Sequence, residues 1–229
     1  MTPATNQQLA ELMSGVELVM LDFDGPICSV FAGLPAPVVA ERLRTSLRGL
    51  GVSMSLELER DEDPLSIYRR SATFGPAITA QVYEHLVAAE IEAVGSAEPT
   101  AGATEVIYAA QAGGRRVAIV SNNSATAVES YIKRHNLASF IDHVAARRAP
   151  DPTLMKPSPA YLVEAGTALG VPADESALVG DSVTDIEAAL YARVHAIGYA
   201  NKAGKHERLL AAGAEAVIST MTDLVHLLN

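Results

Sequence analysis

From Gly114 onward the chain repeats one unit: a short apolar run, a turn and an amphipathic stretch. The apolar runs lie at 116–120, 176–179, 194–199 and 216–219, and an earlier run at 18–23 has the same character. The amphipathic stretches lie at 124–135, 184–191, 204–212 and 221–228. Because the runs are apolar at nearly every position, strands formed from them have no face for water. The sequence therefore predicts an α/β fold, a doubly wound parallel sheet covered by helices on both sides.

The stretch between Cys28 and about Gly95 has a different pattern, with helical periodicity but no comparable buried strand. Helices are predicted at 37–50, 64–73 and 76–94, whereas the alternation at 52–59 fits either an edge strand or a connecting loop. We therefore expect a small helical cap domain at 28–95 and an α/β core at 1–27 and 96–229. Residues 96–102 would form the return hinge.

Composition limits the partners of the protein. The chain has 229 residues, of which 49% are hydrophobic, so it can bury a sizeable core. Its net charge is −10, and Lys and Arg are scattered along it. We therefore expect no binding to nucleic acid or to an anionic membrane, whereas a metal cation would suit the acidity.

The single cysteine, Cys28, excludes an internal disulfide framework and fits a reducing compartment. The first residues lack the basic and apolar regions of a signal peptide. No apolar run approaches the roughly 18 residues that a membrane span requires. We expect a cytoplasmic protein that is a monomer or a homodimer.

Polar side chains follow the predicted strands where each one ends. They are Asp22, Asp24, Ser121, Asn122, Asp181 and Asp185, and Lys156 stands between Met155 and two prolines just before a later helix. Strands of a parallel sheet all end at one edge, where ligands bind. We therefore expect these side chains to meet there.

Taken singly, each residue also has an ordinary structural role. Asp24 fits a turn, and Ser121 or Asn122 could cap a helix. Lys156 could be a surface charge, and Asp185 could favour a helix dipole. These separate roles do not explain why four acids, a lysine and two small polar side chains reach one edge of one sheet.

Carboxylates gathered together repel one another unless a cation neutralises them, and Mg²⁺ is a hard cation that prefers oxygen ligands. Lys156, the Ser121 hydroxyl and the amides after Asn122 could then hold phosphoryl oxygens. A carboxylate can attack phosphorus, and two acids spaced i and i+2 suit a division into nucleophile and proton carrier.

Four segments in this order, "DFDG", "SNN", "KPSP" and "GDSVTD", resemble the four motifs of the haloacid dehalogenase superfamily. The insertion after the first strand resembles the subgroup with a helical cap, which includes phosphoglycolate phosphatases and β-phosphoglucomutase. The resemblance extends over nearly the whole chain. It implies a Mg²⁺-dependent phosphatase acting on a small phosphorylated metabolite, of the phosphoglycolate or sugar phosphate type.

The resemblance also implies roles for individual residues. Asp22 would be the nucleophile that becomes an aspartyl-phosphate, and Asp24 would be the general acid and then the base. Ser121, Asn122 and Lys156 would bind the phosphoryl group. The metal ligands would be the Asp22 carboxylate, the Asp24 backbone carbonyl, Asp181 and Asp185. Pro26 departs from the usual Asp-Gly-Thr-Leu of capped phosphatases, which puts contacts and movement near it in doubt.

Several alternatives stay open at this stage. A phosphomutase or phosphotransferase needs the same two aspartates, and a phosphoacceptor or binding protein could keep the motifs without turnover. A dehalogenase has no use for Asp24. A phosphonate-cleaving relative would need a cap lysine, and residues 33–95 contain none. Candidate substrate contacts in the cap are Arg69, Arg70, Phe74, Arg42, Arg44 and Arg48.

Overall fold

The computed structural model describes residues 3–228, which are built around one parallel sheet of six strands in the order β3-β2-β1-β4-β5-β6. The strands are β1 (Leu18–Leu21), β2 (Arg116–Ser124), β3 (His143–Arg147), β4 (Ser176–Gly180), β5 (His195–Tyr199) and β6 (Ala216–Ile218). The predicted α/β fold with a doubly wound parallel sheet is confirmed.

Strand β1 lies between β2 and β4, and all four of its residues are buried. Leu18 stands opposite Arg116 on one side and Ser176 on the other. The strand is apolar on both faces because helices cover both of them. It therefore delivers the residue that follows it to the centre of the carboxyl edge.

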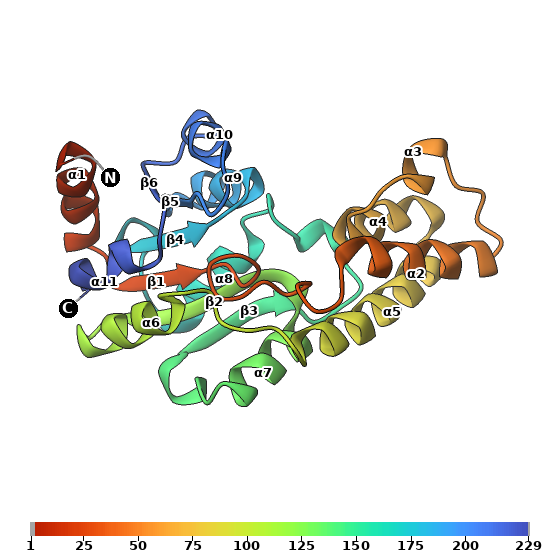
Figure 1. The fold of residues 1–229 in the computed structure, drawn as a ribbon, viewed down its shortest axis with the longest axis horizontal. Coiled ribbons are helices and arrows are strands. Elements are labelled where there is room, and N and C mark those ends of the chain that lie inside the picture. Colours follow the sequence, from red (N-terminus) through yellow and green to blue (C-terminus); the bar gives the residue numbers. More distant parts are fainter. Residues whose placement is uncertain (1–2, 229) are drawn as a thin grey trace.

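Two sets of helices cover the sheet (Figure 1). One face, which includes Val19 and Leu21, packs against α1 (Pro3–Ser14), α6 (Ala103–Ala112), α7 (Ala125–Arg134) and α11 (Thr222–Leu228). The other face, which includes Leu18 and Met20, packs against α8 (Ala160–Leu169), α9 (Val183–Ala192) and α10 (Lys205–Ala211). Alternate residues of one strand thus belong to two separate apolar cores.

The helices inserted after β1 form a third apolar cluster of their own, which includes Leu43, Ile67, Tyr68 and Val82. They are α2 (Ala36–Gly49), α3 (Leu56–Glu59), α4 (Pro64–Ser71) and α5 (Pro76–Val94). Figure 1 shows them beyond the ends to which the strand arrows point. These helices, called the cap below, lie within the predicted range 28–95, although the domain boundaries themselves stay a prediction.

Short 3-10 helices complete the chain at η1 (Ala72–Phe74), η2 (Ala138–Phe140), η3 (Pro152–Leu154) and η4 (Ala173–Glu175). Within residues 3–228, no helix combines the length and the apolar character that crossing a bilayer requires.

The edge strand considered for 52–59 is wrong, because residues 56–59 form α3. The Ser55 hydroxyl accepts a hydrogen bond from the Leu58 amide and caps this short helix. Helix α1, helix α6 and strand β3 were not predicted. The edge strand β3 has the sequence HVAAR, whose apolar run is only three residues long.

Candidate active site

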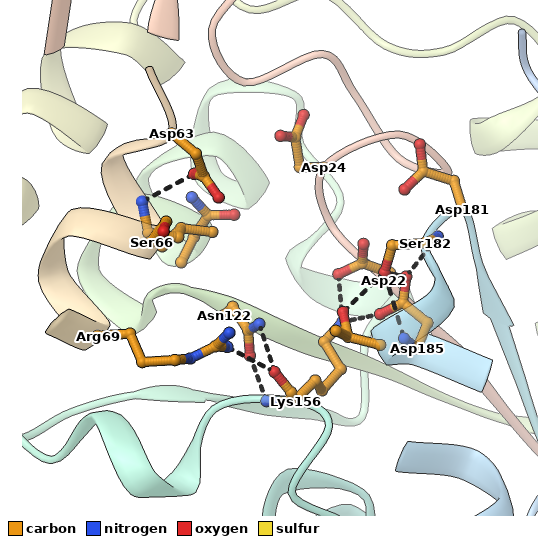
Figure 2. Close-up of a pocket in the computed structure, with 13 residues that line it drawn as sticks. Asp22, Asp24, Asp63, Ser66, Arg69, Asn122, Lys156, Asp181, Ser182 and Asp185 are labelled. Atoms are coloured by element: carbon orange, nitrogen blue, oxygen red, sulfur yellow. Dashed lines mark hydrogen bonds and ion pairs between the residues drawn. The ribbon is translucent and has the colours of Figure 1, made fainter. Parts of the chain in front are cut away.

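Asp22 directly follows β1, and its amide extends the ladder by donating to the Val179 carbonyl at 2.9 Å. Its side chain points into a cavity at the carboxyl edge of the sheet (Figure 2). Only 8% of the residue is exposed. The carboxylate is therefore fixed by the most central strand of the fold.

The loop after Asp22 is held tightly on both sides. Gly25 has a φ of +114°, and a Cβ on it would lie 2.5 Å from Cγ of Asp181, so only glycine fits there. Thr100 donates to the carbonyls of Gly25 (2.6 Å, from Oγ1) and Ile27 (2.8 Å, from the amide). Pro26 lies buried between these two anchored carbonyls, in a loop with little freedom of its own.

Asp24 lines the same cavity as Asp22. Its Oδ1 accepts a hydrogen bond from the Val30 amide at 2.9 Å. Burial raises the pKa of Asp24 to about 6, because desolvation outweighs the opposing effect of that hydrogen bond. A carboxyl group with such a pKa can give up or take a proton near neutral pH.

Lys156 is the cation of the site, and the residue is only 2% exposed. Its Nζ lies 2.7 Å from Oδ1 of Asp22 and 2.5 Å from Oδ1 of Asp185, and it donates to the Val120 carbonyl at 3.1 Å. Burial by itself lowers the pKa of Lys156. The two carboxylates, Asp185 and Asp22, together raise it by more, so the net pKa is above its ordinary value. The ammonium group therefore stays charged beside Asp22.

Negative charge nevertheless exceeds positive charge here. Burial raises the pKa of Asp22 well above its ordinary value, and repulsion from Asp185 and Asp181 adds to this effect while Lys156 opposes it. Oxygen atoms of these three aspartates all lie within 4.8 Å of one another. A hard divalent cation fits such a set of carboxylates and would relieve their repulsion.

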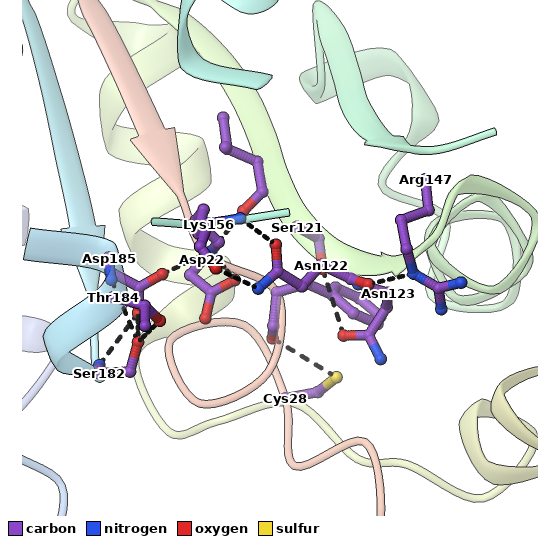
Figure 3. Close-up of polar contacts among 12 residues, drawn as sticks. Asp22, Cys28, Ser121, Asn122, Asn123, Arg147, Lys156, Ser182, Thr184 and Asp185 are labelled. Carbon is purple, nitrogen blue, oxygen red and sulfur yellow. Dashed lines mark hydrogen bonds and ion pairs between the residues drawn. The ribbon is translucent and has the colours of Figure 1, made fainter. Parts of the chain in front are cut away.

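Asp185 is oriented by its own helix. It forms a capping box at the start of α9, in which its Oδ2 accepts from the amide (3.0 Å) and the hydroxyl (2.6 Å) of Ser182. This leaves Oδ1 for Lys156 (Figure 3).

Asp181 has partners from the loop and helix that follow β5. Its Oδ2 lies 2.5 Å from Nζ of Lys205 and accepts from Nδ2 of Asn201 at 3.0 Å. Because these residues follow the neighbouring strand, they arrive at the same edge of the sheet as Asp181.

The cavity has a volume of about 300 Å³ and is lined by residues of both the core and the cap. Its core-side lining comprises Asp22, Asp24, Asn122, Asn123, Lys156, Asp181, Ser182, Thr184 and Asp185. Its cap-side lining comprises Asp63, Leu65, Ser66 and Arg69, which belong to α4 or directly precede it. A small polar molecule bound here would lie between the aspartates and α4 (Figure 2).

This geometry agrees with a comparison against protein families, in which residues 16–193 match the model for haloacid dehalogenase-like hydrolases. The chain belongs to this family. The resemblance carried by the four sequence motifs is thereby confirmed, and the protein is an enzyme of the hydrolase class. A search of curated protein sequences gives no match.

Solved structures of the haloacid dehalogenase-like family share the fold. CbbY from Rhodobacter sphaeroides in complex with phosphate has a TM-score of 0.69 and 21% identity, with 91% of this chain and 96% of that chain covered. A predicted phosphatase from Clostridium acetobutylicum has a TM-score of 0.70 and 16% identity, with 92% and 97% covered. At these identities the similarity shows the fold.

Within this hydrolase fold, the predicted site residues lie at one edge of the sheet, and all of them except Ser121 line the cavity. The Asn122 side chain is bonded to the Lys156 backbone, since its Oδ1 accepts from the Lys156 amide at 2.8 Å. Ser121 is fully buried, and its hydroxyl accepts from the Asn123 amide at 3.0 Å and donates to Oδ1 of Asn123 at 3.2 Å. Phosphate binding by Ser121 stays a prediction. In the structure its hydroxyl is hydrogen-bonded to Asn123 at the end of β2.

Among the six cap residues predicted as substrate contacts, Arg69 lines the cavity, and its Nη2 donates to the Lys156 carbonyl at 2.7 Å. The other arginines pair with acids elsewhere: Arg42 with Glu92, Arg44 with Glu41, Arg48 with Glu41 and Glu59, and Arg70 with Glu57. Phe74 does not line the cavity.

Sequence reasoning missed several residues of the site. Asn201 and Lys205 could have been found by applying the strand-end rule to β5 as well. Asp63 and Ser66 carry no such signal, because their place above the cavity depends on how α4 packs over the core.

Proposed function

We propose that this hydrolase is a Mg²⁺-dependent phosphatase that releases phosphate from a small phosphorylated metabolite. One observation carries the proposal: Asp22 and Asp24 line a single cavity, with the charged Lys156 against the first and a pKa of about 6 on the second. This arrangement places a carboxylate that can act as nucleophile against a lysine, beside a second carboxyl group that can exchange a proton near neutral pH.

In the first half of the reaction, a carboxylate oxygen of Asp22 attacks phosphorus and forms an aspartyl-phosphate. The bond from phosphorus to the leaving oxygen breaks, and Asp24 gives its proton to that oxygen, which leaves as an alcohol. Lys156 holds Asp22 in place and offsets negative charge that develops on the phosphoryl oxygens.

In the second half, Asp24 is ionised and takes a proton from a water molecule, whose oxygen attacks phosphorus. The bond between phosphorus and Asp22 breaks and phosphate is released. Asp22 is then a free carboxylate again and Asp24 is again protonated, so the cycle is balanced.

The carboxylates of Asp22, Asp181 and Asp185 would hold the divalent cation, with the Asp24 carbonyl as a further oxygen ligand. When bound, the cation supplies positive charge for the phosphoryl oxygens. Lys205 and Asn201 both contact Oδ2 of Asp181 and so restrict the orientation of its carboxylate.

The nature of the substrate is proposed from the size and charge of the cavity. A volume of about 300 Å³ with Arg69 and Ser66 on the cap side suits a short polar chain such as phosphoglycolate or a sugar phosphate. Structures of CbbY contain phosphate and, in a mutant, xylulose-(1,5)bisphosphate. They support phosphorylated substrates of this size for the present chain as well.

Asp24 also separates this proposal from its rivals. Removal of a halide needs no proton donor, so a dehalogenase gains nothing from Asp24 and its raised pKa. A phosphomutase uses the same acids and passes the phosphoryl group back to its product. Isomerised product without free phosphate would indicate that alternative.

We place this activity in the cytoplasm, in a monomer or homodimer. Cys28 is a buried free thiol, and burial raises its pKa, so it is an unreactive packed side chain in a reducing compartment.

The test is phosphate release from a panel of phosphorylated metabolites, measured with Mg²⁺ and with a chelator. We expect turnover that the chelator removes, and a fall in kcat of roughly 10⁴-fold or more in Asp22→Asn. Asp174→Asn, an exposed change of the same chemistry, is the matched control. Full activity in Asp22→Asn, or no turnover of any panel member by the natural enzyme, would reject the proposal.

A further inference from the structure

A second ion pair is buried completely, outside the cavity. Nη2 of Arg147, at the end of β3, lies 2.5 Å from Oε1 of Glu90 on α5, and both side chains are 0% exposed. Removing two charges from water costs more than their attraction commonly returns. A pair of this kind is therefore poor at stabilising a fold, and its remaining contacts indicate what it does.

Those contacts converge on the end of β2. Arg147 donates from Nε to the Asn122 carbonyl. Glu90 accepts from Nδ2 of Asn123 at 3.2 Å and from the amide of Ser124 at 2.8 Å. Three consecutive residues are thus held by one ion pair, although the two charged residues are 57 positions apart in the sequence.

The held segment in turn holds Lys156. Asn122 accepts from the Lys156 amide at 2.8 Å through Oδ1 and donates to its carbonyl at 3.4 Å through Nδ2 (Figure 3). Nζ of the same lysine contacts Asp22. A continuous series of hydrogen bonds therefore leads from Glu90 to the proposed nucleophile.

The other end of the series lies in the cap. The Arg147 guanidinium carbon stands 4.9 Å from the ring centroid of Tyr68 on α4 and 5.3 Å from that of Tyr83 on α5. Among the described residues, Nη1 of Arg147 has no hydrogen-bond partner, so the aromatic faces are its remaining contact. A core arginine is thus inserted between cap helices.

We infer that Glu90 and Arg147 are a positioning pair, which sets Lys156 for phosphoryl transfer through Asn122 and makes its placement depend on how the cap helix α5 is seated. The inference rests on the proposed function where it concerns turnover. It predicts in addition that the backbone of Lys156 is held by this pair, whatever the substrate.

The experiment compares Glu90→Gln, Arg147→Met and the double variant. Each single change leaves one charge buried without a partner, so we expect the thermal midpoint to fall on the order of 10 °C. The double variant removes both charges and should recover most of that loss. Its kcat should nevertheless be roughly 100-fold below that of the natural enzyme, with KM within about threefold, because Lys156 is misplaced.

Amide hydrogen exchange provides a readout that does not depend on the substrate. In the double variant the Lys156 amide, which donates to Asn122, should exchange at least about tenfold faster at equal stability. Faster exchange in an enzyme that releases phosphate from no substrate would reject the proposed function and keep the positioning role. Natural exchange and natural kcat in the double variant would overturn the positioning role.

A neighbouring ion pair supplies the matched control. Arg148 lies 3.0 Å from Glu129, with side chains 55% and 52% exposed. The double change Glu129→Gln with Arg148→Met should alter neither kcat nor the exchange of the Lys156 amide.

A further variant serves if the buried double variant does not fold. Arg147→Lys keeps the positive charge but lacks the planar guanidinium group that reaches Glu90 and Asn122 together. A natural kcat in folded Arg147→Lys would also overturn the inference.

Discussion

The cap surface and the carboxyl edge of the sheet both carry ion pairs, but in opposite environments. The pairs of Arg42, Arg48 and Arg70 on the cap have arginine side chains that are 39–48% exposed. At the sheet edge, the side chain of Lys156 is 2% exposed and that of Arg147 is 0% exposed. Exposed pairs contribute little to stability, whereas a buried charge that loses its partner is costly. The ion pairs for which we propose a function are the buried ones at the sheet edge, whereas the exposed pairs on the cap have no proposed role.

After that of Asp22→Asn, the largest expected effect is that of Lys156→Met. Without the ammonium group, Asp22 loses its partner at 2.7 Å and the phosphoryl charge is no longer offset. We expect kcat to fall by roughly 10³-fold or more. The exposed Lys133→Met is the control and should keep its activity. A kcat within tenfold of the natural value would place the buried lysine in the same class as the surface charges.

The next effect concerns the pH dependence of stability in the metal-free protein. The ordinary pKa of Asp24 is 3.8 and its folded value is about 6, so between these values the folded state binds more protons than the unfolded state. The contribution of Asp24 is therefore fully present below pH 3.8 and is lost as pH rises through 6.

Asp24→Asn has no such proton to lose. The difference in free energy of unfolding between Asp24→Asn and the natural protein should therefore shift by roughly 2 kcal/mol in favour of the variant when pH rises from 4 to 7. Denaturant titrations at both pH values measure this difference, and Asp174→Asn should show none. A constant difference would mean that Asp24 is ionised in the folded protein throughout this range.

Arg69→Ala tests the one predicted cap arginine that reaches the cavity. If Arg69 binds an acidic part of the substrate, KM should rise about tenfold while kcat changes little. The adjacent Arg70→Ala, whose side chain pairs with Glu57 instead, should change neither constant. A fall in kcat alone would assign Arg69 to holding the Lys156 carbonyl rather than to the substrate.

The smallest effect is expected for Arg42→Ala, which breaks the exposed pair with Glu92. Water solvates both groups before and after the change, so thermal unfolding should show no measurable shift in the midpoint. A shift as large as that of Arg147→Met would remove the distinction between exposed and buried pairs.

The local sequence pattern predicted much of the fold. Continuous apolar runs predicted five of the six strands, and the strand-end rule brought Asp22, Asp181 and Asp185 to one edge. The β3 strand was not predicted, because its alanines have low strand propensity and its first and last residues are polar. The 52–59 segment alternates in sequence but forms a capped helical turn, because a local hydrogen bond of Ser55 prevailed over the alternation.

The sequence by itself determined the parallel sheet, the inserted cap helices and the order in which acids and lysine arrive at the strand ends, because these depend on periodicity and on spacing along the chain. Only the tertiary structure decided which of the candidate side chains meet. It turned the Ser121 hydroxyl inward, brought Arg69 rather than Arg70 into the cavity, and joined Glu90 to Arg147. Burial and charge pairing arise from contacts between residues far apart in the chain, which no local pattern records.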